Sequence, residues 1–305
     1  MSFSADVKAE LIGRTDTARH CVIASLSALI NLCGEYSIGQ GDDYVIISSE
    51  NDRVIELVLD IIERLFGFKC DVTLIDNRPA IVLMEDKAKD MLCTAGFAGR
   101  SSTAAEEPIN PLIVASDCCK RAYLKTAFIC CGSVTDPEKN YHFEYVNNDY
   151  YHARNIRELI AGFGIEAKII ERKNHYIVYL KEGEQIVDML NLISAHNALM
   201  EYENKRIIKD VRNNVNRIVN CETANLNKTV AASVKQREAI EYIKSKVGFS
   251  YLSPQLEEIA RARLENPSLS LKELGDKLNP PVGKSGVNHR LKKLCEIAAQ
   301  LKGEL

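Results

Sequence analysis

The sequence predicts an α+β protein in which a duplicated domain of helices and strands precedes an all-α domain. The same order of helical and strand patterns occurs twice in the first 200 residues, the strand pattern disappears beyond residue 195, and basic residues concentrate in the last third of the chain. We assign residues 1–200 to the duplicated domain, with half-repeats at about 1–100 and 112–200. Residues 201–250 are predicted to form a helical linker, and residues 251–305 the all-α domain.

Each half-repeat shows helical periodicity alternating with β-branched runs, and the elements follow in the same order. In the first half, helices are predicted at 18–34, 52–66 and 85–95, with strands at 44–49, 69–75 and 80–84. In the second half, helices are predicted at 117–132, 149–163 and 182–195, with strands at 141–146, 166–171 and 175–180. We interpret both halves as αββαββα units. The Gly, Ser and Pro residues of 96–111 predict a loop between them.

A nine-residue motif lies in the first helix of each half. It reads LSALINLCG from Leu26 to Gly34 and LKTAFICCG from Leu124 to Gly132, 98 positions later. Both copies resemble the LAGLIDADG helix of homing endonucleases. Two such helices can approach each other closely where their side chains are small. In this chain the small residues are Ser27, Ala28, Thr126 and Ala127.

The penultimate position of each motif is a cysteine. In the endonucleases this position is an acid that helps to hold the divalent metal for phosphodiester cleavage, whereas here it is Cys33 in the first copy and Cys131 in the second. Magnesium binds carboxylate and phosphate oxygens and has little affinity for sulfur. The sequence therefore predicts the nuclease scaffold without the nuclease activity. We expect no catalytic residue, no metal and no cofactor.

The chain contains ten cysteines. The adjacent pairs Cys118-Cys119 and Cys130-Cys131 lack the Cys-x-x-Cys spacing of a zinc or thioredoxin-like site, and no histidine lies at a suitable short interval. We expect buried free thiols in a reducing cytoplasm, because no leader pattern is present. The longest apolar run, 21–33, falls short of the roughly 20 residues of a membrane span, so no span is predicted.

The net charge of −3 conceals a division along the chain. Residues 1–204 hold 20 basic and 31 acidic side chains, a net charge of −11. Residues 205–305 hold 19 basic and 11 acidic side chains, a net charge of +8. A polyanion is repelled on average by the first part and attracted by the second. We therefore expect contact with nucleic acid to concentrate in the carboxy-terminal third.

Apolar residues at helical spacing predict a long bridging helix over 197–220. An Arg- and Asn-rich cluster begins in its second half. The possible phosphate contacts in this cluster are Arg212, Asn213, Arg217 and Lys228. The alternative interpretation is that the amides cap and turn the chain between two helices.

Three helices with clear start signals follow. They are predicted at 255–264, at 271–278 and from 284 or 285 to about 301, with a turn at 279–283. Ser253 is expected to cap the first of them, with Pro254 in its first turn. Ser270 and Glu273 form a capping box that opens the second. Two short helices, a tight turn and a third amphipathic helix predict a helix-turn-helix.

The last of these helices has an apolar side and a polar side. The apolar stripe, which should pack on the preceding helices, consists of Val287, Leu291, Leu294 and Ala298. The candidate DNA-binding residues are Lys284, Ser285, Gly286, Asn288, His289, Arg290, Lys292 and Lys293.

Each of these candidates has an expected role. Because such a helix enters the major groove with its amino-terminal residues deepest, we expect Ser285, Asn288 and His289 to read base edges. The lysines and Arg290 are expected to meet phosphates, and Gly286 to allow close approach to the backbone. A solvated helix with an ordinary polar face is the alternative interpretation.

With both halves in view, the chain resembles the WhiA family of bacterial regulators along nearly its whole length. The segments that carry the resemblance are MSFSADVKAE at 1–10, DPEK at 136–139, ERKN at 171–174, the stretch 213–230 and KSGVNHRL at 284–291. The resemblance implies a LAGLIDADG-like domain without nuclease activity, joined to a helix-turn-helix similar to region 4 of sigma factors. It also implies a role in sporulation septation, cell division or chromosome segregation and, in actinobacteria, a partner protein with an iron-sulfur cluster.

These observations lead to the hypothesis of a cytoplasmic, nucleoid-associated, sequence-specific DNA-binding regulator. The last helix would read bases, the linker would position it, and the first domain would serve partner contact or sensing. Two alternatives stay open. One is a metal-dependent nuclease that uses Glu35 or Asp136 in place of the missing acids. The other is a chromosome-associated or scaffold protein that binds DNA without a preferred sequence.

Overall fold

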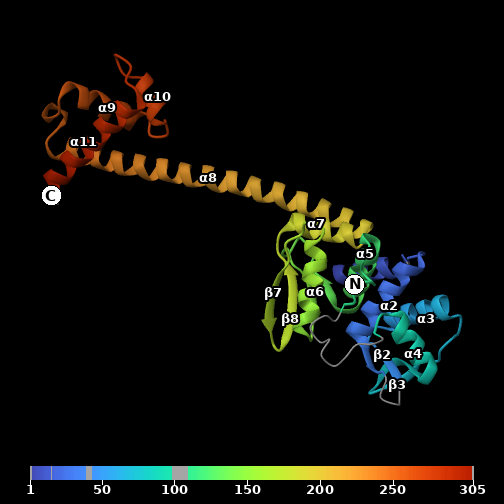
Figure 1. Ribbon diagram of the computed structural model, residues 1–305. Helices are drawn as coiled ribbons and strands as arrows, with labels where there is room; N and C mark the ends of the chain where they lie inside the picture. The colour runs from blue at the N-terminus through green and yellow to red at the C-terminus, as the bar shows by residue number, and fades with distance from the viewer. Residues whose placement is uncertain (1, 15, 39–42, 98–108, 304–305) are drawn as a thin grey trace. The chain divides into compact units, whose positions relative to one another are not determined.

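The computed structural model describes residues 2–14, 16–38, 43–97 and 109–303. Most of the predicted loop at 96–111 therefore lies outside the described residues. The chain divides into two compact units, Met1–Asp210 and Val211–Leu305, each of which is described by itself (Figure 1). No helix of the described ranges is both long and apolar enough to cross a membrane.

The first unit contains the two predicted αββαββα halves, preceded by a helix α1 (Phe3–Ile12). The first half consists of α2 (Arg19–Cys33), β1 (Gly34–Ser37), β2 (Tyr44–Ser48), α3 (Asp52–Phe66), β3 (Thr73–Ile75), β4 (Arg78–Met84) and α4 (Glu85–Thr94). The second half consists of α5 (Asp117–Cys131), β5 (Gly132–Val134), β6 (Phe143–Asn147), α6 (Tyr150–Ala161), β7 (Lys168–Arg172), β8 (His175–Leu180) and α7 (Gly183–Leu192). The α+β fold class is confirmed.

Each half forms a four-stranded antiparallel sheet, with strand orders β1-β2-β4-β3 and β5-β6-β8-β7. The equivalent orders show that both halves fold by the same topology. Strands β1 and β5 were absent from the series of predicted strands, because segments of four and three residues are too short to show an alternating pattern.

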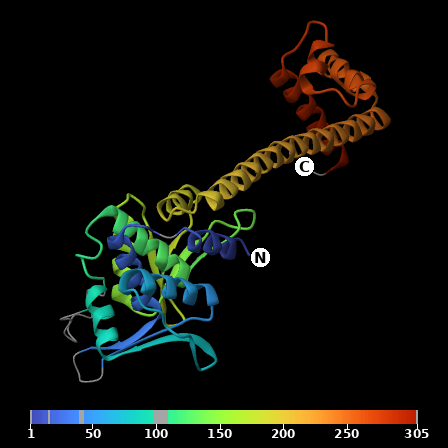
Figure 2. The same ribbon diagram turned by 90° about the vertical axis from the view of Figure 1, so that its right-hand side faces the viewer.

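Motif helices α2 and α5 lie side by side in the core of the first unit (Figures 1 and 2). The small residues expected at this contact are all buried: Ser27, Ala28, Thr126 and Ala127. Each helix ends at a glycine from which the next strand departs at once. A Cβ added to Gly132 would lie 2.2 Å from Cδ2 of Phe128, so no larger residue fits there without displacing that ring.

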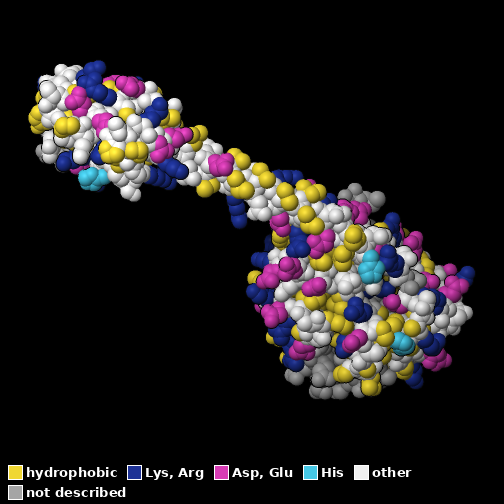
Figure 3. Space-filling model, turned by 90° about the horizontal axis from the view of Figure 1, so that it is seen from above, with side chains coloured by type: hydrophobic (Ala, Val, Ile, Leu, Met, Phe, Trp, Pro, Cys, Tyr) yellow, Lys and Arg dark blue, Asp and Glu magenta, His cyan; other side chains and the backbone are white. Residues whose placement is uncertain are grey.

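Helix α8 (His196–Lys246) begins in the first unit and ends in the second. The predicted bridging helix at 197–220 therefore continues well beyond its expected end. The interpretation of the Asn-rich cluster as a cap and turn is wrong, because the helix passes through it without a break. Residues 211–232 are all exposed. Large apolar side chains recur along this stretch (Figure 3), at Val211, Val215, Ile218, Val219, Leu226 and Val230.

The second unit contains the end of α8, a 3-10 turn η2 (Phe249–Tyr251), and the helices α9 (Pro254–Glu265), α10 (Leu271–Asp276) and α11 (Lys284–Lys302). The predicted capping box is present: Ser270 Oγ accepts the N–H of Glu273, whose carboxylate accepts the N–H of Ser270 at 2.9 Å. Pro254 begins α9 as predicted. The side chain of Ser253 makes no capping hydrogen bond, unlike the prediction.

The core of the second unit joins α9, α10 and α11 to the last turns of α8. Ile240 and Ile243 of α8 are fully buried, as are Ile259 of α9, Leu274 of α10 and Leu291 of α11. The helix-turn-helix core therefore takes in residues that precede position 251, where we placed the start of that domain.

Candidate nucleic-acid interface

Helix α11 has one buried side and one exposed side, as the sequence predicts. Val287, Leu291 and Leu294 are fully buried in the core of the second unit. The exposed candidates are Lys284, Ser285, Asn288, His289, Lys292 and Lys293. Six of the eight candidate residues are therefore exposed to solvent.

Gly286 is half-buried, and the structure gives an internal reason for the absence of its side chain. A Cβ at this position would lie 2.6 Å from Cγ1 of Val282, in the turn that precedes α11. A Cβ on Gly275 of α10 would lie 2.0 Å from the carbonyl oxygen of the same valine. The two glycines let the turn pack closely between α10 and α11.

Arg290 is also half-buried, and its guanidinium faces another helix. Its Nη1 lies 4.0 Å from Oε2 of Glu258 on α9, and Oε1 of Glu258 accepts the N–H of Asn279 at 2.8 Å. These contacts connect α11, α9 and the intervening turn. Arg290 is therefore less available to a phosphate than the exposed lysines are.

A surface groove separates α11 from the last part of α8. Its lining residues are Ala232, Lys235, Gln236, Asn288, Lys292 and Cys295. Two ammonium groups thus come from different helices to one groove. Sequence reasoning missed Lys235, because nothing in the linear order places it beside the last helix. It also missed Lys272 and Lys277, two exposed lysines on and just after α10.

The four possible phosphate contacts of α8 are all exposed. Asn213, Arg217, Lys228 and Lys235 follow one another at intervals of four, eleven and seven residues. Each interval is close to a whole number of helical turns, so these side chains share one side of α8. Arg212 directly precedes Asn213 and therefore points to another side.

The penultimate residue of each motif copy is a cysteine at the end of its helix. Cys33 and Cys131 end α2 and α5, and both are half-buried. Cys131 Sγ donates to the carbonyl oxygen of Ala127 at 3.2 Å, and burial raises the pKa of its thiol to about 12. The ammonium of Lys8 on α1 lies beside these thiols, where burial lowers its pKa.

Neither alternative acid belongs to a metal-ligand cluster among the residues that the structure describes. Glu35 is exposed on β1. Asp136 accepts a hydrogen bond from Nζ of Lys205 on α8 at 2.8 Å. Burial opposes ionisation of Asp136, but the hydrogen bonds from Lys205 and from the N–H of Glu138 prevail and lower its pKa.

The outer face of the first sheet carries apolar and acidic residues. Glu35 lies opposite Ile46, which lies opposite Val82, and Tyr44 lies opposite Met84 on the same face. The strands of this sheet contain one basic residue, Arg78 of β4, and its guanidinium is paired with Oε1 of Glu50 at 2.9 Å. This face offers little attraction to phosphates, in contrast to α11.

The structure corrects the expectation for the adjacent cysteines. Cys118 is exposed, so the prediction of a buried thiol is wrong for this residue. A histidine does lie within reach, because Nδ1 of His20 on α2 is 3.2 Å from Sγ of Cys119 on α5. His20 and Cys119 are 99 residues apart, in different half-repeats, so they do not show the short spacing by which metal ligands are recognised in a sequence.

Comparisons with known proteins agree with this two-part organisation. Residues 120–212 match the family described as WhiA LAGLIDADG-like domain, and residues 215–298 match the WhiA C-terminal HTH domain. The crystal structure of full-length DUF199/WhiA from Thermatoga maritima is similar with a TM-score of 0.58 and 26% identity, over 98% of this chain and 99% of that one.

Two relatives, each named probable cell division protein WhiA, match almost from end to end. The protein of Lachnoclostridium phytofermentans is 42% identical over 312 residues, which cover 99% of this chain and 100% of that one. The protein of Thermoanaerobacter pseudethanolicus is 45% identical over 313 residues, which cover 99% of this chain and 98% of that one. At this identity and coverage, the chain belongs to the WhiA family.

Proposed function

We propose that this protein is a sequence-specific DNA-binding transcriptional regulator that acts in cell division. The observation that carries the proposal is the two-sided helix α11, with a buried apolar stripe and three exposed hydrogen-bonding side chains, Ser285, Asn288 and His289, in its first two turns. The relatives are named probable cell division proteins, and this name supports cell division as the process. Sporulation and chromosome segregation are the further processes that the family resemblance implies.

Base reading is assigned to the amino-terminal part of α11. The first residues of a recognition helix contact base edges in the major groove. The amide of Asn288 can pair with two groups of an adenine, and the hydroxyl of Ser285 and the imidazole of His289 can each make one hydrogen bond. Each good contact is worth about 1–3 kcal/mol of discrimination against the wrong base.

Phosphate binding is assigned to lysines on three helices of the second unit. Lys284, Lys292 and Lys293 lie on α11, while Lys272 and Lys277 lie on and beside α10. On α8, Lys235 borders the same groove as Lys292, and Arg217 and Lys228 lie on the same side of that helix. Such contacts fix the position of a protein on the duplex and make its affinity depend on salt.

We further propose that the LAGLIDADG-like unit does not cleave DNA. Its motif positions carry thiols, and Asp136 is engaged with Lys205. The apolar and acidic outer face of the first sheet favours contact with a protein partner over contact with DNA. An iron-sulfur partner, as the resemblance implies for actinobacteria, stays a prediction. We propose a cytoplasmic, nucleoid-associated location for the protein.

The test is selection of bound duplexes from a random-sequence pool by the full-length protein near physiological salt. One enriched motif is expected, and the Asn288→Ala and His289→Ala variants should lose preference at one or two of its positions. Lys89→Ala, which removes an exposed charge from α4, serves as the control and should select the unchanged motif. Retention of DNA without any enriched motif would support the chromosome-associated alternative instead.

The absence of cleavage is tested with the same duplexes. Bound DNA incubated with Mg²⁺ or Mn²⁺ should stay intact. Cleavage that Glu35→Ala or Asp136→Asn abolishes would establish the nuclease alternative.

A further inference from the structure

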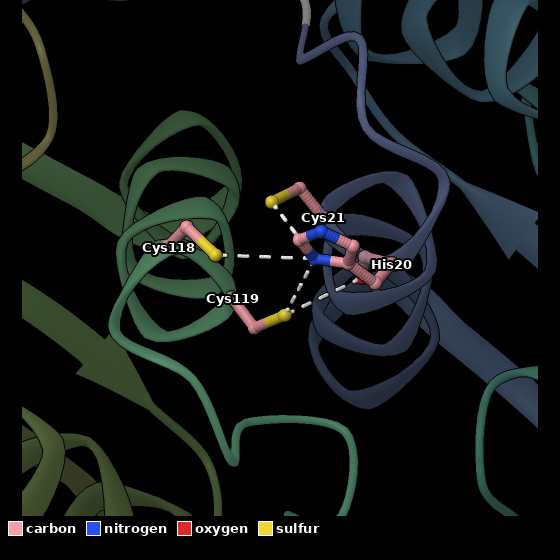
Figure 4. A group of neighbouring side chains, drawn as sticks. All are labelled: His20, Cys21, Cys118 and Cys119. Atoms are coloured by element: carbon pink, nitrogen blue, oxygen red, sulfur yellow. Dashed lines mark hydrogen bonds between the residues drawn. The ribbon is translucent and has the colours of Figure 1, made fainter.

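Four metal-ligating side chains meet at the amino-terminal ends of α2 and α5. They are His20, Cys21, Cys118 and Cys119, and one ligand atom of each lies within 4.8 Å of all the others. Nδ1 of His20 lies 3.3 Å from Sγ of Cys21, 3.2 Å from Sγ of Cys119 and 3.9 Å from Sγ of Cys118. Figure 4 shows the three sulfurs around one imidazole nitrogen.

The four residues occupy equivalent positions in the two half-repeats. Cys118 follows His20 by 98 residues, and Cys119 follows Cys21 by the same interval, which also separates the two motif copies. Each pair forms the second and third residues of its helix. Because the duplicated helices pack side by side, two adjacent pairs that show no metal spacing in the sequence become one four-ligand cluster.

The distances suit a tetrahedral zinc ion. Zinc bonds of about 2.3 Å to sulfur and about 2.0–2.1 Å to nitrogen place sulfur and nitrogen ligands about 3.6 Å apart. The three observed sulfur-nitrogen distances, from 3.2 to 3.9 Å, bracket this value. We propose that this cluster binds Zn²⁺ through Nδ1 of His20 and the thiolates of Cys21, Cys118 and Cys119.

The ligand set selects the metal. Three thiolates and one imidazole are soft and borderline donors, which suit zinc and are unsuited to magnesium or calcium. Binding releases the three thiol protons to solvent and leaves a site with a net charge of −1. The free N–H groups at the first turns of both helices offset this negative charge.

Ser116 supports the sulfur ligands from outside the first coordination sphere. It is the N-cap residue of α5, yet its side chain makes no capping hydrogen bond. Its hydroxyl lies 3.1 Å from Sγ of Cys119 and 3.4 Å from Sγ of Cys118. Groups of this kind orient metal ligands and commonly change metal affinity by about 10–100-fold.

The site has a structural role rather than a catalytic one. All four positions of a tetrahedral ion are filled by protein ligands, which leaves none for water or substrate. The ion connects the two half-repeats at the amino-terminal ends of α2 and α5. Cys33 and Cys131 lie at the carboxy-terminal ends of the same helices. Cys21 and Cys119 are buried, while His20 and Cys118 are exposed, so the ion is reached from the surface.

The test is the metal content of the full-length protein, purified with a reductant, without added metal and without a histidine tag. About one zinc ion per chain is expected by plasma mass spectrometry. Cys118→Ser and His20→Ala should each lose most of this zinc, because each removes one ligand. Both residues are exposed, so these variants should keep the wild-type circular dichroism. Cys93→Ser, at an exposed cysteine of α4, is the matched control and should keep its zinc.

A second measurement uses cobalt as a spectroscopic probe. Co²⁺ added to the metal-free protein should give the intense visible bands of tetrahedral thiolate coordination, and these should be lost in Cys118→Ser. Ser116→Ala should weaken zinc affinity by about 10–100-fold. Protein without zinc, iron in its place, a disulfide between two of the three cysteines in reductant, or equal zinc in wild type and both ligand variants would overturn the proposal.

Discussion

Glu10 caps the start of α8 by accepting the backbone N–H of Asn197 at 2.9 Å, and its second carboxylate oxygen accepts the N–H of Ala198 at 2.9 Å. The guanidinium of Arg14 lies 3.3 Å from the same carboxylate. A residue of α1 thus satisfies two of the free donors of a distant helix, the nearer of them 187 positions later in the chain. Helix α1 is part of the architecture of the first unit.

Replacing Glu10 by Ala should lower the free energy of unfolding by about 0.5–2 kcal/mol, as for the loss of other helix caps. Glu10→Gln keeps one acceptor oxygen and should lower the free energy of unfolding by less than Glu10→Ala does. The measurement is urea unfolding followed by circular dichroism. Glu56→Ala, at an exposed acid of α3, is the control. Equal unfolding midpoints for Glu10→Ala and wild type would show that the cap contributes nothing.

Gly286→Ala should destabilise the second unit although alanine is the better helix former. The added Cβ would meet Cγ1 of Val282 at 2.6 Å, and such overpacking commonly costs about 1–3 kcal/mol, against about 1 kcal/mol gained in helix propensity. The thermal midpoint of the second unit should fall. The double variant Gly286→Ala with Val282→Ala should recover part of the loss, and the absence of any recovery would contradict the proposed clash.

Lys235→Ala and Lys293→Ala should each weaken binding to all duplexes and reduce the slope of log affinity against log salt by about 1. The reason is that each removes one phosphate contact and no base contact. Titration of one labelled duplex at several salt concentrations measures this slope. An unchanged slope for Lys235→Ala, alongside a reduced slope for Lys293→Ala, would exclude Lys235 from the interface. Lys89→Ala again serves as the control.

The Asp136–Lys205 pair should make the first unit less stable in acid. The pKa of Asp136 is lowered in the folded protein, so its contribution is present above the unfolded value of about 3.9 and is lost as the pH falls through the folded value. Asp136→Asn should therefore be less stable than wild type at neutral pH, by about 0.2–1 kcal/mol for a partly exposed pair. The difference should shrink towards pH 3 in urea unfolding, and a constant difference would contradict the assignment.

Sequence patterns predicted best the helices whose caps and periodicity lie within the helix itself. The motif helices were predicted from their helical periodicity, and α10 from its capping box, because caps and periodicity are local properties. The bridging helix was predicted to end too early because Asn is a poor helix former. That preference is weak, and the helix continues through Asn213 and its neighbours.

The features that the sequence did not predict depend on contacts between distant segments. His20 and Cys119 come together only because α2 packs along α5. Lys235 joins the candidate interface only because the end of α8 borders α11. The contact of Arg290 with Glu258 likewise requires the packing of α9 on α11. No short interval along the chain encodes these three contacts.

The exposed stretch of α8 at 211–232 has a consequence for local unfolding. No side chain in it is buried in either core, so its helical structure depends on local hydrogen bonds alone. Most helical stability in proteins comes from tertiary packing, which this stretch lacks, and its amides and β-branched residues are poor helix formers. Its backbone amides should exchange with deuterium faster than those of α2 or α11, and limited proteolysis should cut there first. Each fragment would retain its own hydrophobic core.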